Sequence, residues 1–105
     1  MMLKINDIEI DERSLNCLKD KQKGSLSLTY FKGAILEMSL AETAPEIYGI
    51  WQEARRNLHT IYEGSVYGEE DFFVLDMELA RSVRQRARQL GLVYTAGKNG
   101  NSQHL

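Results

Sequence analysis

The stretch over residues 43–62 constrains the fold more than any other part of this chain. It opens with "TAPE", a capping box in which the Thr43 hydroxyl accepts from the third amide of a helix while the Glu46 carboxylate reaches back to the cap. Pro45 falls in the first turn, where its missing N–H costs nothing. Apolar residues then recur at spacings of 4, 3, 4 and 3, the period of a helix with one buried face: Ile47, Trp51, Ala54, Leu58 and Ile61. These features predict an amphipathic helix over 44–62.

The N-terminal segment "LKINDIEI" predicts a β-hairpin over 3–10. Asn6 and Asp7 tolerate the positive φ angles of a two-residue loop. A loop of that length pairs Ile5 with Ile8, and the register that follows gathers the apolar side chains of both strands on one face. Loop chemistry and side-chain pattern therefore agree.

The segment "SLSLTYFKGAILEMSL" predicts a second β-hairpin over 25–40. A three-residue loop, Phe31-Lys32-Gly33, collects the apolar side chains on one face, whereas a two-residue loop mixes the faces. It also places Gly33 at the left-handed position that a bulged loop requires. A helix over 34–42 is the alternative that the pattern leaves open.

Between the two predicted hairpins, "DERSLNCLKDKQKG" predicts a short helix over 12–22. Asp11 has the side chain of an N-cap. Leu15 and Leu18 form an i, i+3 apolar pair, and Gly24 follows as a stop.

The last predicted element is a helix over 76–90, with Asp76 as its N-cap and Gly91 as its left-handed C-terminal residue. Four consecutive apolar residues precede it at 72–75, which favours a short buried strand or an extended lead-in over a first helical turn.

Together these elements predict one α+β domain over 1–94, with a small antiparallel sheet from the two hairpins covered by the three helices, and a flexible tail over 95–105. The length of 105 residues suits a single domain. No apolar run approaches the roughly 18–20 residues of a membrane span, so we expect no membrane association. Cys17 is the only cysteine, which excludes an intrachain disulfide and favours a reducing, cytoplasmic location.

Sequence patterns of catalysis are missing from the chain. It has no GxxxxGK[ST], GxGxxG, HExxH, CxxC or GxSxG pattern, and its two histidines are His59 and His104. The acidic run Glu69-Glu70-Asp71 places carboxylates at adjacent positions, which do not share a helix face. We therefore expect no catalytic site, no cofactor and no metal site, and we keep His59 with the acidic run as the weakest hypothesis.

The segment "ELARSVRQRARQLGL" carries four arginines within residues 81–88. Its apolar positions form one helix face, and Arg81, Arg84 and Arg88 form a second stripe with Gln85 beside it. These four residues are the candidate site for a protein or nucleic-acid partner. The part "VRQRARQLGL" loosely resembles the closing turn of helix-turn-helix recognition helices, a likeness that amphipathic basic helices share and that assigns no family. That resemblance covers about ten of the 105 residues, and no matching first helix and short turn precede it.

Charge divides unevenly along the chain. Residues 1–80 carry eight Lys/Arg and fifteen Asp/Glu, a net −7, whereas residues 81–105 carry five Lys/Arg and no Asp or Glu, a net +5. The leading hypothesis is therefore a small non-enzymatic adaptor, inhibitor or accessory protein, of a kind common in bacteria and their phages, that binds a protein with an acidic surface. A nucleic-acid-binding regulator is the alternative, and exposed sheet edges leave homo-oligomerisation open.

Overall fold

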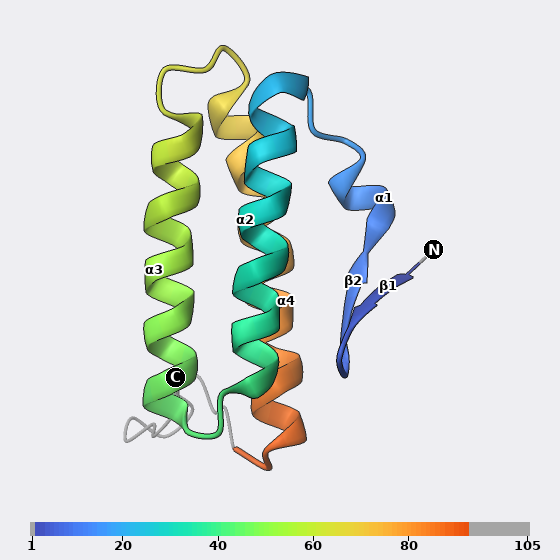
Figure 1. Cartoon of the computed structure of the whole chain (residues 1–105), viewed down its shortest axis with the longest axis vertical. Helices are drawn as coiled ribbons and strands as arrows, with labels where there is room; N and C mark the ends of the chain where they lie inside the picture. The colour runs from blue at the N-terminus through green and yellow to red at the C-terminus, as the bar shows by residue number, and fades with distance from the viewer. Residues whose placement is uncertain (1, 93–105) are drawn as a thin grey trace, which may run out of the picture.

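A computed structural model describes residues 2–92, and the predicted tail over 95–105 lies outside them. In chain order its elements are β1 (Met2–Ile5), β2 (Ile8–Asp11), α1 (Glu12–Leu15), α2 (Lys21–Leu40), α3 (Ala44–Tyr62) and α4 (Gly68–Gln89). Helices α2, α3 and α4 pack against one another as a bundle, and the hairpin lies against α2 and α4 on the side away from α3 (Figure 1). The α+β class is as predicted, although helices supply most of the structure.

The N-terminal hairpin is confirmed in its register. Ile5 pairs with Ile8, and the pairing continues to Leu3 with Ile10. Asn6 has a φ of 53°, the left-handed conformation expected at the start of the loop. On β2, Ile8 and Ile10 are fully buried, so the shared apolar face of the hairpin does pack into the core.

The prediction of a second hairpin over 25–40 is wrong, because this segment belongs to the twenty-residue helix α2. Its buried positions follow a helical period, but small or polar residues such as Gly24, Ser27 and Ala34 occupy several of them. Leu26 and Leu36 are exposed instead, which hides the helical pattern from a reading based on hydrophobicity. Gly33 sits inside the helix, with nothing within 4 Å of the position a Cβ would take.

The predicted helix over 12–22 is broken in two. Asp11 caps the first part as expected, accepting from the Arg13 amide at 3.0 Å, but α1 ends at Leu15. A new helix then starts at Lys21 with Asp20 as its N-cap. Gly24 therefore lies in the first turn of α2 and is not the C-terminal stop that was predicted. The helix cannot run through because the Lys19 and Asp20 amides both donate to the Asp71 carboxylate, at 2.9 Å each.

Helix α3 has the predicted bounds. The Glu46 amide donates to the Thr43 hydroxyl at 3.3 Å and the Thr43 amide donates to the Glu46 carboxylate at 3.1 Å, which completes the capping box. Ile47, Ala54 and Leu58 are buried, as the spacing predicts, while Trp51 and Ile61 are half-buried.

Helix α4 starts at Gly68, so the predicted strand or lead-in over 72–75 is helical and Asp76 is not a cap. Asp76 lies within the helix and forms an ion pair with Arg55 on α3 at 2.8 Å. The end of the helix is as expected, since Gly91 has a φ of 74°. The first turn carries Glu69, Glu70 and Asp71, where a helix dipole favours negative charge.

The core lies between the three long helices and the inner face of the hairpin. Ile47, Leu58 and Val83 are buried in it, and Leu90 is half-buried. Leu3, Ile5 and Leu28 pack at the periphery, whereas Leu26 and Leu36 are exposed and do not share the single apolar face expected for residues 25–40. Over the described part of the chain, none of the helices combines the length and apolarity that crossing a bilayer demands.

Candidate functional site

The predicted arginine stripe divides into structural and free members. Gln85 faces the hairpin: its amide nitrogen donates to the Glu9 carbonyl at 2.7 Å, and its oxygen accepts from the Glu9 amide at 2.9 Å. Arg81 is half-buried and lies 3.5 Å from Glu78, whose carboxylate also accepts from the Asp11 amide. Gln85 is thereby a structural residue, and Arg81 is partly neutralised.

These contacts also close an edge of the sheet. Glu78 and Gln85 of α4 bond to the backbone of β2 at Asp11 and Glu9, and Gln89 donates to the Asp7 carbonyl at 2.8 Å. Because α4 side chains occupy the outer hydrogen-bonding positions of β2, that edge is not open for another strand. The expectation of open edges is wrong for β2.

Arg84 and Arg88 are exposed, and within residues 2–92 neither guanidinium group forms an ion pair or a hydrogen bond. Arg86, which stands on the opposite flank, donates to the Ala41 carbonyl at 2.9 Å and to Gln89 at 3.1 Å. It therefore ties α4 to the turn between α2 and α3. Within the described residues, Arg84 and Arg88 are therefore the two of the four arginines whose guanidinium groups are free to contact a partner.

Two large apolar side chains share the exposed side of α4 with these arginines. Phe73 is 62% exposed and Met77 is 56% exposed. At 3.6 residues per turn, Phe73, Met77, Arg84 and Arg88 fall within an arc of about 60°. We call this line of four residues the α4 stripe; it is apolar toward the start of the helix and basic toward its end.

Sequence reasoning missed Phe73 because it treated residues 72–75 as buried, and it left Met77 unassigned although Met77 lies within the predicted helix over 76–90. Only Leu75 of that run is fully buried, with Phe72 and Val74 half-buried. The signal was available: extending the helical period of the arginines backwards by 7 and 11 positions from Arg84 reaches Met77 and Phe73. Finding Phe73 in this way requires that the helix begin before Asp76.

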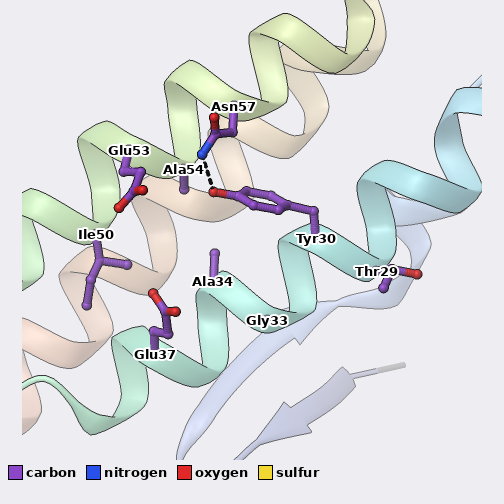
Figure 2. A pocket seen from close by; sticks show the side chains of 9 residues that line it. All are labelled: Thr29, Tyr30, Gly33, Ala34, Glu37, Ile50, Glu53, Ala54 and Asn57. Carbon is purple, nitrogen blue, oxygen red and sulfur yellow. Dashed lines mark hydrogen bonds between the residues drawn. The ribbon is translucent and has the colours of Figure 1, made fainter.

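A second feature lies between α2 and α3, where the surface is hollowed by about 430 Å³ (Figure 2). Small residues create the space: Ala34 and Ala54 line it, and Gly33 presents no side chain. At one end, Asn57 donates to the Tyr30 hydroxyl at 2.6 Å. The hollow continues toward the α2–α3 turn as a second depression of about 480 Å³, which shares Glu37, Ile50 and Glu53 with the first.

We call these two depressions together the acidic groove. Glu37 of α2 and Glu53 of α3 are both exposed and reach toward the space from opposite sides (Figure 2). Within the described residues neither carboxylate has a hydrogen bond or an ion pair, and no Lys, Arg or His lines the groove. Glu46 also borders the groove, but its carboxylate is engaged at the start of α3. The Glu42 and Thr43 amides donate hydrogen bonds to it, and these bonds lower the pKa of Glu46.

The acidic run and His59 are dispersed. Asp71 is buried and bound to backbone amides, while Glu70 pairs with Lys19 on the surface. His59 and Glu69 do border one hollow of about 620 Å³ beside the α3–α4 turn, and His59 stacks edge-on against Phe72 with ring centroids 5.4 Å apart. Between Met2 and Leu92, no three His, Cys, Asp or Glu side chains come together as metal ligands would.

Searches of known proteins returned no match to this chain, whether among protein-family models, curated proteins or solved structures. The fold and the two surface features therefore carry the functional argument alone.

Proposed function

We propose that this chain is a small non-enzymatic accessory protein that acts in the cytosol by docking on another protein through the α4 stripe. The observation that carries the proposal is the alignment of Phe73 and Met77 with Arg84 and Arg88 on one exposed face. Helix-in-groove recognition uses apolar anchors on one helix face, and Phe73 and Met77 have its i, i+4 spacing. The partner chemistry that fits is an apolar depression bordered by carboxylates.

The energetic argument rests on the apolar half of the stripe. Aromatic and Met side chains are enriched at interfaces, and they gain most when water leaves their surface on binding. Exposed arginines contribute more to the rate of encounter and to the choice of partner than to affinity. Phe73 and Met77 are thus expected to set the lifetime of the complex, and Arg84 and Arg88 its rate of formation.

A nucleic-acid-binding regulator is the second candidate, because Arg84 and Arg88 stand free on one side of a helix, within the part of the chain that is described. Two phosphate contacts would give a shallow salt dependence, since the slope of log K against log salt is about −0.9 per phosphate on duplex DNA. Gln85, the fourth candidate residue, does not add a base contact, because its side-chain amide is engaged with the Glu9 backbone. Phe73 and Met77 do not favour a phosphate surface, which ranks this candidate second.

The experiment compares proteins captured from the native host by tagged wild-type chain and by two double variants. Arg84→Glu/Arg88→Glu reverses the basic half of the stripe. Lys32→Glu/Arg56→Glu makes the same change in net charge at exposed positions outside it. We expect a partner that the first variant loses and the control keeps.

The partner so identified is then purified and its binding is measured directly. Phe73→Ala and Met77→Ala should each speed dissociation by about tenfold or more, as loss of an interface anchor does. Equal retention of every captured protein by both double variants would refute docking through the stripe. Fluorescence anisotropy with a labelled duplex tests the alternative: salt-sensitive binding that Arg84→Glu/Arg88→Glu removes and Phe73→Ala does not would replace a protein partner with nucleic acid.

A further inference from the structure

We propose that the acidic groove receives the α4 stripe of a second copy of this chain, so that copies associate head to tail. This inference rests on the proposed docking role of the stripe and names one partner for it. Glu37 and Glu53 face the groove without cations within the described residues, and Arg84 and Arg88 stand without anions on α4.

The shape of the groove suits a helix edge rather than a flat surface. Ala34 and Ala54 keep its floor low, and Gly33 and Gly49 have nothing within 4 Å of the positions that Cβ atoms would occupy. Side chains from a docking helix can therefore enter between α2 and α3 without displacing this chain's own atoms.

The walls of the groove offer apolar contact as well as charge. Ile50 is half-buried in both depressions, and Leu40 is 66% exposed where the groove approaches the α2–α3 turn. Met77 and Phe73 are the corresponding exposed apolar groups on the stripe. Both surfaces thus pair an apolar part with a charged part, and the charges have opposite sign.

Charge favours the pairing on both sides. Two carboxylates facing one hollow repel each other, and a cation placed between them relieves that repulsion while the surrounding protein excludes water. Arg84 and Arg88 are four residues apart on one helix, so their Cα atoms are about 6 Å apart along its axis. That spacing lets both guanidinium groups approach one groove at the same time.

The two surfaces lie on opposite sides of the bundle. In Figure 1, α2 and α3 are in front and α4 is behind them, and the stripe is on the face of α4 turned away from its buried residues Leu75, Leu79 and Ser82. One copy therefore cannot exchange the same pair of surfaces with another around a two-fold axis. The contact is heterologous and extends into a ring or an open chain.

The test uses two charge reversals measured by size-exclusion chromatography with light scattering, over concentrations up to about 1 mM at low salt. Glu37→Lys/Glu53→Lys reverses the groove, and Arg84→Glu/Arg88→Glu reverses the stripe. We expect the mass of the wild-type protein to rise with concentration and the association constant of each variant to fall by at least about tenfold.

Mixing the two variants tests whether the groove pairs directly with the stripe. Each reversed groove then meets a complementary stripe on the other variant, so the equimolar mixture should recover association to within about threefold of wild type. The control Glu9→Lys/Glu42→Lys makes the same charge change as the groove variant at exposed positions that line neither the groove nor the stripe, and it should associate like wild type. Far-UV circular dichroism confirms that all variants are folded.

Three results would overturn the inference. A wild-type protein that stays monomeric at every concentration excludes self-association, while the host-partner experiment still decides whether the stripe docks on other proteins. Association that needs Arg84 and Arg88 but tolerates reversal of Glu37 and Glu53 places the stripe elsewhere on the second copy. Failure of the mixed variants to associate removes the direct pairing of the two surfaces.

Discussion

Replacing Asp71 by alanine should unfold the junction between the hairpin segment and the long helices. Asp71 is 1% exposed in the first turn of α4, and its two oxygens accept separately from the Lys19 and Asp20 amides at 2.9 Å. Those amides begin the chain reversal that leads into α2. The carboxylate therefore joins two segments that are about fifty residues apart in the sequence, a separation of 51 to 52 positions.

The expected loss follows from the two hydrogen bonds. A bond to a charged acceptor contributes about 1.5–3 kcal/mol, and a buried donor left without a partner bears its desolvation cost. Lys19 is exposed and Asp20 is half-buried, so water recovers part of the loss at both amides. We expect Asp71→Ala to lower the free energy of unfolding by about 3 kcal/mol, against a total of roughly 5–15 kcal/mol for a small domain.

Asp71→Asn gives a graded comparison. Its one amide oxygen can accept from a single backbone N–H, while its NH₂ group turns a donor toward the other. We expect a loss between those of wild type and alanine. Glu70→Ala is the matched control, because this neighbouring carboxylate is exposed and pairs with Lys19 at the surface, where ion pairs contribute little.

Urea unfolding followed by far-UV circular dichroism measures the free energy of unfolding of the wild type and of each of the three variants. The values are compared only where the m value is unchanged. Amide hydrogen exchange adds a local readout, since Lys19 and Asp20 should lose protection in Asp71→Ala even where the variant remains folded. The reasoning is refuted if Asp71→Ala unfolds within about 0.5 kcal/mol of Glu70→Ala, or if both amides keep their wild-type protection.

Three further predictions concern pH and backbone packing. The Lys23 amide donates to the Asp20 carboxylate and lowers the pKa of Asp20 below the ordinary 3.8. The ionised carboxylate therefore stabilises the fold above pH 3.8, and this contribution is lost as the pH falls through the folded-state pKa. Asp20→Asn should flatten acid unfolding curves recorded by circular dichroism. Burial raises the pKa of Tyr62 above the ordinary 10.0, so stability should fall as pH rises past 10, and Tyr62→Phe should remove that fall in urea titrations at alkaline pH. Gly68→Ala should cost about 1–3 kcal/mol in urea unfolding, because its Cβ would lie 2.5 Å from the Tyr62 carbonyl oxygen, whereas Gly49→Ala meets nothing within 4 Å and should gain up to about 1 kcal/mol from helix propensity.

The hairpin over 3–10 and the helix over 44–62 could be predicted because their determinants are local. A capping box acts over four consecutive residues, and Thr43 and Glu46 meet in the structure as the motif requires. The register of the hairpin follows from its two-residue loop and from one apolar face, both within ten residues of sequence. Nothing from the rest of the chain is needed to select either element.

Helix α2 was hidden in the hydrophobic pattern because small or polar residues share its buried face with Phe31, Ile35 and Met38 while two leucines lie outside. The helix packs on α3, α4 and the hairpin, and Gly24, Ser27 and Ala34 stand at buried positions beside Phe31, Ile35 and Met38. Leu26 and Leu36 remain exposed to solvent. A prediction that expects leucines inside and glycines at turns therefore selects a hairpin.

The candidate site divides along the same line. Sequence alone placed Arg84 and Arg88 on one exposed face, since helical periodicity within ten residues determines it. It also assigned Gln85 to the same surface, and only the tertiary structure binds that amide to Glu9, which is 76 positions away. Phe73 joined the stripe once the start of α4 was known, whereas Met77 already lay within the predicted helix and had been left unassigned.

What the sequence determined by itself is the set of elements whose cause is local: a capped helix, a tight hairpin, a left-handed Gly91 and a basic stripe on the last helix. What the tertiary structure decided is where helices begin and which polar groups are occupied. The Asp71 carboxylate accepts hydrogen bonds from two amides in the segment between α1 and α2, which keeps these helices separate. Hydrogen bonds between such distant residues leave no periodic pattern in the sequence. The same is true of the acidic groove, whose two facing carboxylates belong to separate helices and meet only when α2 packs on α3.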